Sequence, residues 1–211
     1  MSEKLDIKNL ILVPAIITLG ISCLRLTGEL LGWAEKLFGR AAGGGASLVG
    51  IAWLVPVFGI YYGWKLTKMG NHARSPGKLI GFSLLSFIIL AAVTGALMTT
   101  LPSYPTFTLI LMSTTAVGTM FLLRSSWPEL FRTLLCYGFA ARIPVILIMF
   151  LAIMGNWGTH YDSPPPELEG MHWFLEWVIT GLIPQATVWI WYTVVVGGLF
   201  AGLAALVFKK S

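Results

Sequence analysis

Residues 155–185 read GNWGTHYDSPPPELEGMHWFLEWVITGLIPQ, and they form a long polar interruption in the apolar second half of the chain. The stretch holds two of the three histidines and four of the nine acidic residues. The sequence on both sides is apolar over lengths that can cross a hydrocarbon core of about 30 Å. We therefore expect a membrane-surface segment here, between two transmembrane helices.

The composition of the whole chain is typical of a polytopic membrane protein rather than of a soluble domain. Of the 211 residues, 56% are hydrophobic and only 11% are charged. We predict an all-α protein that forms one transmembrane domain over residues 1–211, with six membrane-spanning helices. The expected spans cover about residues 9–31, 46–66, 79–101, 106–123, 130–154 and 185–208.

The first of these apolar runs has an alternative interpretation as a signal peptide, because a charged start precedes it. No small-x-small cleavage motif closes the run, so we interpret it as a retained span. The chain contains no H-E-x-x-H, G-x-S-x-G or Walker motif that would assign a reaction.

Lysine and arginine fall mostly in alternate connections. Residues 65–78 carry Lys65, Lys68, Arg74 and Lys78 without any acid, which is typical of a cytoplasmic loop. With six spans, both termini then lie in the cytoplasm, and we expect location in the bacterial inner (plasma) membrane.

The net charge of +5 is therefore explained by the basic residues of the predicted cytoplasmic loops. No basic stripe with interleaved aromatic residues indicates a nucleic-acid partner.

The polar stretch is expected to contain an amphipathic helix that lies on the outer membrane surface. Ser163 and the three prolines after it can begin such a helix. Gly181 and Pro184 then offer a break, so that the last span begins at about Gln185.

Charged residues inside predicted spans are the first candidates for a functional site. Arg142 lies near the middle of the fifth span, where a charge costs about 2.5–3.5 kcal/mol on insertion scales. It must face the bundle, either as part of a solute path or as a buried group that fixes helix packing. Arg25 and Glu29 share a helix face and can pair, at the outer interface or along a polar path. With Gln185 at the entry to the last span, these residues form our candidate ion path.

A second candidate site lies on the outer face. Its side chains are of the types that bind a metal or transfer protons, but their spacing is not specific. A zinc site would require His160 or Asp162 to fold back toward the helix, and we predict neither metal nor cofactor. The residues are His160, Asp162, Glu169, His172 and Glu176.

Small residues in two spans predict close helix packing. Gly59 and Gly63 in the second span, and Gly198 and Gly202 in the last, are each four residues apart. They could support a homo-oligomer or a contact with a membrane-complex partner. Pro56 is expected to kink the second span.

The intramembrane charge favours a channel or transporter for an ion or small anionic solute, because fixed charge often marks transport paths. The alternative is a non-catalytic accessory or assembly subunit of a membrane complex. A third hypothesis is a membrane-embedded enzyme with a site on the outer face.

Overall fold

The computed structural model describes residues 6–40, 47–101, 105–168 and 170–208, and within these ranges the chain forms helices and connections without any strand. In this described part, five helical segments are long and apolar enough to cross a membrane. They are α1 (Ile7–Leu30), α4 (Pro76–Thr100), α5 with the 3-10 turn η1 (Pro105–Ser125), α6 (Pro128–Gly155) and the run Trp173–Phe208. The predicted all-helical fold, with several helices able to span a membrane, is thus confirmed.

The helix α1 shows which side of the bundle meets lipid. Its buried positions include Thr18 and Ser22, whereas the large apolar side chains of Leu12, Val13 and Ile16 are exposed. A soluble helix would show the opposite arrangement. The apolar surface of α1 is therefore suited to hydrocarbon, and its polar face lines the interior.

The second predicted span is shorter than expected. The helix α3 covers Leu54–Lys68, only 15 residues, and residues 48–53 form bends and turns before it. At 1.5 Å per residue, α3 extends about 22 Å, which is less than the hydrocarbon thickness. The expected kink at Pro56 is also wrong. Pro56 lies in the first turn of α3, where its missing N–H leaves no helical hydrogen bond unmade.

The four glycines predicted to pack helices do so within one chain. A Cβ at Gly59 would lie 2.5 Å from the carbonyl oxygen of Gly197, and one at Gly63 would lie 2.9 Å from the backbone of α9 (Val188–Phe208). Gly198 and Gly202 approach side chains of η1 (Phe121–Ser125) and α4 equally closely. The predicted close packing is thus present within the chain, whereas an oligomer or a partner at these faces stays a prediction.

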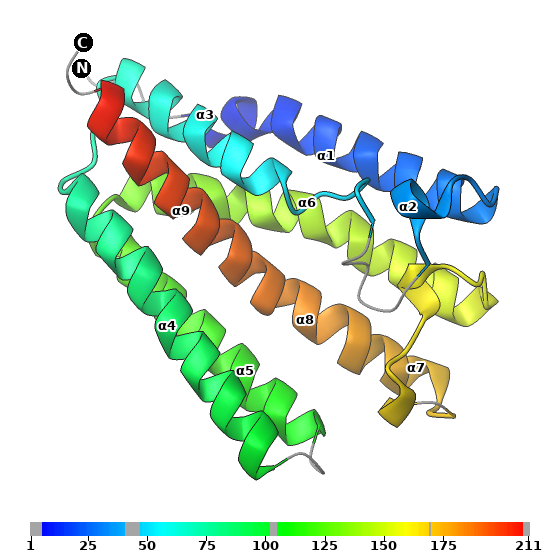
Figure 1. The fold of residues 1–211 in the computed structure, drawn as a ribbon. Coiled ribbons are helices and arrows are strands. Elements are labelled where there is room, and N and C mark those ends of the chain that lie inside the picture. Colours follow the sequence, from blue (N-terminus) through cyan, green and yellow to red (C-terminus); the bar gives the residue numbers. More distant parts are fainter. Residues whose placement is uncertain (1–5, 41–46, 102–104, 169, 209–211) are drawn as a thin grey trace.

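The chain after the polar stretch forms one helical run instead of a surface helix and a separate span. Figure 1 shows the parts of this run following one another in line. They are α7 (Trp173–Glu176), the π-helix η4 (Trp177–Leu182), α8 (Ile183–Ala186) and α9. The expected break at Gly181 and Pro184 is wrong, because the π turn and α8 absorb both residues. The run of 36 residues extends about 54 Å, so it must tilt or project from the membrane.

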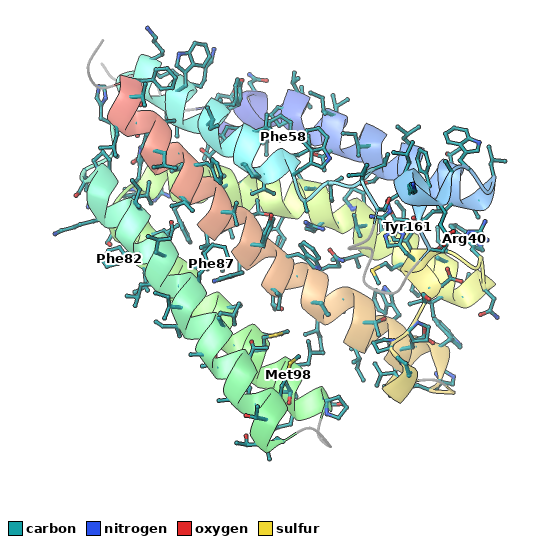
Figure 2. The ribbon with its side chains drawn as sticks, viewed as in Figure 1. Arg40, Phe58, Phe82, Phe87, Met98 and Tyr161 are labelled. Carbon is teal, nitrogen blue, oxygen red and sulfur yellow. The ribbon has the colours of Figure 1, made fainter. Side chains whose placement is uncertain are left out.

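Polar contacts and aromatic rings join the helices across the interior. Thr18 Oγ1 and Tyr137 Oη lie 2.8 Å apart between α1 and α6, and Trp191 Nε1 donates a 2.7 Å hydrogen bond to Ser86 Oγ. Phe87, labelled in Figure 2 between α4 and α9, packs edge-on against Trp191 with a ring separation of 5.0 Å. Figure 1 also shows α1 beginning, and α9 ending, toward the end of the bundle where α3 leads into α4.

Candidate functional site

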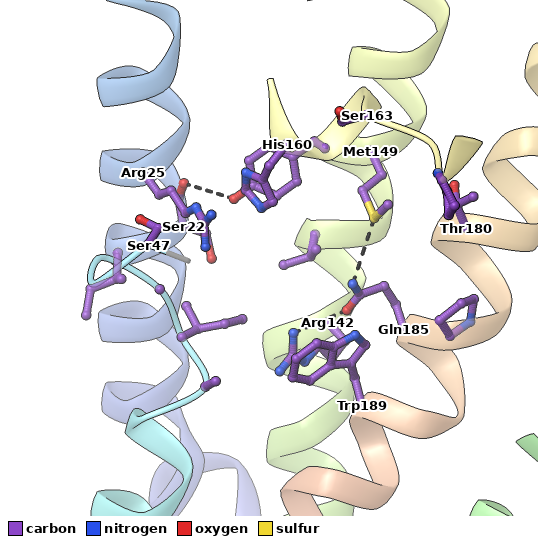
Figure 3. A pocket seen from close by; sticks show the side chains of 18 of the residues that line it. Ser22, Arg25, Ser47, Arg142, Met149, His160, Ser163, Thr180, Gln185 and Trp189 are labelled. Atoms are coloured by element: carbon purple, nitrogen blue, oxygen red, sulfur yellow. Dashed lines mark hydrogen bonds between the residues drawn. The ribbon is translucent and has the colours of Figure 1, made fainter. Parts of the chain in front are cut away.

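A cavity of about 670 Å³ lies between α1, α6 and the last helical run, next to residues 47–53 (Figure 3). Most of its lining is apolar, from side chains such as Ile51, Val145 and Trp189. Its polar lining residues include Ser22, Arg25, Ser47, Arg142, His160, Ser163, Thr180 and Gln185. The cavity thus brings together three of the four candidate path residues, Arg25, Arg142 and Gln185, although they lie on three different helices.

Arg142 is held in place from the opposite helix. Its side chain is buried, with 4% of the residue surface exposed. Nη1 donates a 3.2 Å hydrogen bond to Oε1 of Gln185, and the guanidinium carbon lies 4.3 Å from the centre of the Trp189 ring. Gln185 is fixed in turn by a 3.8 Å contact from Nε2 to the Sδ atom of Met149. Figure 3 shows this group at one side of the cavity.

The guanidinium of Arg142 retains unused hydrogen-bonding capacity. It has five N–H donors, and the contact to Gln185 is its one hydrogen bond within the described residues. Its buried Nε atom has no partner, and no described carboxylate lies within 4.0 Å of it. The ring of Trp189 offers attraction to the charge but accepts no conventional hydrogen bond. Arg142 is therefore a fixed cation on the cavity wall that lacks a counter-ion among the described side chains.

The second charged group of the cavity is built around Glu29, which is fully buried. Nε of Arg25 lies 2.8 Å from Oε1 of Glu29, so the expected pair is present, but inside the bundle rather than among lipid headgroups. Nη2 of Arg25 also donates to the carbonyl of Gly39, and Arg40 donates to the carbonyl of Glu29. From the polar stretch, His160 approaches Glu29 twice, through its backbone N at 2.9 Å and through Nδ1 at 2.6 Å.

The local fold of residues 158–162 explains how His160 reaches Glu29. The carboxylate of Asp162 accepts hydrogen bonds from the backbone N–H groups of Gly158 and Thr159 and from Oγ1 of Thr159. These bonds close the 3-10 turn η2 (His160–Asp162), and Gly158 permits the entry into it with a φ of +67°. The turn directs the His160 side chain toward α1.

The protonation of His160 follows from its surroundings. Burial lowers the pKa of His160, although the neighbouring carboxylate of Glu29 acts in the opposite direction. The imidazole is therefore neutral at pH 7, and because a carboxylate only accepts hydrogen bonds, Nδ1 carries the proton. Glu29 thus accepts one hydrogen bond from Arg25 and two from His160, which occupy most of its acceptor positions.

The described residues of the predicted outer-face site are not arranged as a metal site. Asp162 is occupied in the η2 turn and His160 by Glu29, whereas His172 is exposed and caps the start of α7. Glu176 is half-buried on α7, and Glu169 lies outside the described residues. No three His, Cys, Asp or Glu residues in the described ranges are arranged to hold a metal ion.

Trp189 is a site residue that sequence reasoning missed, although a signal was available. It follows Gln185 by four positions, so the two share a helix face. The π-helix η4 is the second missed feature, and its Ile179 and Thr180 line the cavity. Helical turns of this type are frequent at functional sites.

Comparison with known proteins gives no relative: no family model, no curated protein and no solved structure matches this chain.

Proposed function

We propose that the protein is a membrane transporter that binds a small organic anion in the central cavity, with Arg142 as the group that holds the anion. The main support for this proposal is the environment of Arg142. The residue is buried and charged, yet among the described residues it makes a single hydrogen bond and has no carboxylate beside it. A guanidinium is matched in geometry to a carboxylate or phosphate oxygen pair. An anion on its free N–H groups would supply the missing counter-charge.

The size and lining of the cavity support an organic anion over an inorganic one. Its volume of about 670 Å³ lies within the range of about 300–1,000 Å³ that is usual for sites of drug-sized ligands. One cationic group among apolar walls suits a molecule with one anionic end and an apolar body. The Arg25–Glu29–His160 group offers no second free cation, because its charges are already paired.

We further propose that the protein lies in a bacterial inner membrane with six crossings and with both termini in the cytoplasm. The exposed Lys65, Lys68 and Lys78 around the α3–α4 connection support this orientation through the positive-inside rule. The short helix α3, together with residues 47–53, would complete the second crossing. Labelling of Lys78→Cys and Trp157→Cys with a membrane-impermeant thiol reagent, in a background without Cys23 and Cys136, tests it. Reaction of the Lys78 position from outside intact cells would overturn this orientation.

The transport proposal is tested in two steps with purified protein. Binding of a series of carboxylates from acetate to octanoate is measured by calorimetry, and flux of the tightest binder is then measured in proteoliposomes. Arg142→Gln removes the charge, and Ile51→Leu is the matched control, because it alters the apolar cavity wall without altering charge.

We expect Arg142→Gln to abolish binding and flux, with Ile51→Leu close to wild type. Equal binding by wild type and Arg142→Gln would overturn the role of Arg142. Binding without flux, together with a partner that co-purifies stoichiometrically, would instead favour the accessory-subunit hypothesis.

A further inference from the structure

A second cavity, of about 540 Å³, lies at the end of the bundle where α3 leads into α4, and it shares no lining residue with the central cavity. Three arginines from three different elements line it. Arg74 belongs to the α3–α4 connection, Arg124 to η1 and Arg132 to the first turns of α6. Glu129 and Phe121 also line this cavity.

Two hydrogen bonds hold the elements of this basic cavity together. The backbone N–H of Arg74 donates to the carbonyl of Ser126 at 3.0 Å, and Nε1 of Trp127 donates to Oδ1 of Asn71 at 2.7 Å. Trp127 is fully buried and so anchors the connection to the bundle. The three arginines are therefore presented from a fixed backbone.

The charge at this cavity is unbalanced. Three guanidinium groups face one carboxylate, that of Glu129, and none of these four groups forms an ion pair with a described side chain. All three arginines are exposed, so their charge is available to a ligand. Like charges at close quarters repel, and an anion with several acceptor oxygens relieves the repulsion. The planar guanidinium group of arginine can donate two parallel hydrogen bonds to phosphate oxygens.

An apolar ring borders the arginines. Phe121 is 46% exposed, and its ring lies 5.3 Å from that of Phe131. At a membrane interface, lipid phosphates adjoin acyl chains. A cluster of cations beside an aromatic side chain can contact both parts of a lipid, the cations at the phosphate and the ring at the acyl chains.

We propose that this cavity binds the phosphate of an anionic phospholipid headgroup, with Arg74, Arg124 and Arg132 around the phosphate and Phe121 against the adjoining apolar part of the lipid. Basic cavities between transmembrane helices bind such headgroups by the same chemistry. Free phosphate would satisfy the arginines but not Phe121. The proposal does not depend on the function proposed for Arg142.

The test uses the full chain in nanodiscs that contain phosphatidylglycerol and phosphatidylcholine in equal amounts. Native mass spectrometry after release into detergent counts the lipids that stay bound. We expect phosphatidylglycerol to be retained selectively. Arg124→Gln and Arg132→Gln should each weaken retention about fivefold, since a basic residue near an anionic surface contributes about 1 kcal/mol. Lys78→Gln is the control, because Lys78 is exposed at the same end but does not line the cavity.

Three further variants test the parts of the proposal separately. Phe121→Ala should weaken lipid retention without changing the affinity for inorganic phosphate, which separates lipid from free phosphate. Arg132→Lys keeps the charge and should restore part of the retention even if Arg132→Gln folds poorly. Arg142→Gln should retain phosphatidylglycerol as wild type does. Equal retention of both lipids, or equal losses in Lys78→Gln and Arg124→Gln, would overturn the proposal.

Discussion

Nδ1 of His160 lies 2.6 Å from Oε1 of Glu29, and this contact joins residues that are 131 positions apart in the chain. It ties the polar stretch between α6 and α7 to the end of α1 and forms part of the cavity wall. Glu29 also holds Arg25, which lies on the same helix, so one buried carboxylate orders the end of α1 and joins it to η2.

Glu29→Gln should destabilise the protein strongly. The substitution removes the carboxylate that pairs with the buried guanidinium of Arg25 and gives Nδ1 of His160 a poorer acceptor. Removal of one partner of a buried ion pair costs about 3–5 kcal/mol. Thermal unfolding in detergent measures the effect, with the exposed Glu35→Gln as control. Equal unfolding temperatures for the two variants would contradict the structural role of Glu29.

Stability should fall on acidification through His160. Burial lowers the pKa of His160 in the folded protein, whereas the unfolded chain takes up this proton near pH 6.5. Between the two pKa values the unfolded state binds more protons, so stability decreases as the pH falls, by at most about 1.4 kcal/mol per pH unit. Unfolding of wild type, His160→Gln and the exposed control His72→Gln is compared at pH 7.5 and 5.5. We expect the pH dependence to shrink in His160→Gln alone. An unchanged dependence would contradict this assignment.

Gly59→Ala and Gly81→Ala should act in opposite directions. A Cβ at Gly59 would lie 2.5 Å from the Gly197 carbonyl oxygen, so α3 and α9 must separate, at a cost of about 1–3 kcal/mol. A Cβ at Gly81 meets no described atom within 4 Å, and alanine favours a helix over glycine by about 0.5–1 kcal/mol. Unfolding temperatures measure both. A loss of stability in Gly81→Ala as large as in Gly59→Ala would argue against the close approach of α3 and α9.

Gln185→Glu should abolish anion binding by supplying an internal counter-ion. The new carboxylate would occupy the position of the amide, whose Oε1 lies 3.2 Å from Nη1 of Arg142. Gln185→Leu removes the same hydrogen bond without adding charge and is the matched control. We expect an affinity loss of at least about tenfold in Gln185→Glu and a smaller one in Gln185→Leu, since charged hydrogen bonds contribute about 1.5–3 kcal/mol. Calorimetric titration with the best carboxylate decides between them. Unaltered affinity in Gln185→Glu would remove Arg142 from the binding site.

The sequence by itself determined the membrane architecture and the bounds of four helices to within about three residues. Long apolar runs are local properties, and the hydrocarbon thickness allows them few solutions. It also singled out Arg142 and the Arg25–Glu29 pair, because a charge in such a run is conspicuous. The start of α3 and the run Trp173–Phe208 were predicted wrongly. Pro56 was expected to kink the second span, but it lies in the first turn of α3. Gly181 and Pro184 were expected to break the last run, but the π turn contains Gly181 and α8 contains Pro184.

Only the tertiary structure decided which polar groups meet. Periodicity places a residue on a helix face, but it does not say which helix that face contacts. The packing of α6 against the last helical run therefore determines that Arg142 meets Gln185 and Trp189 rather than an acid. The η2 turn likewise brings His160 to Glu29, which lies on a helix at the other end of the chain. The central cavity results from these long-range contacts, because its walls come from helices that are distant along the chain.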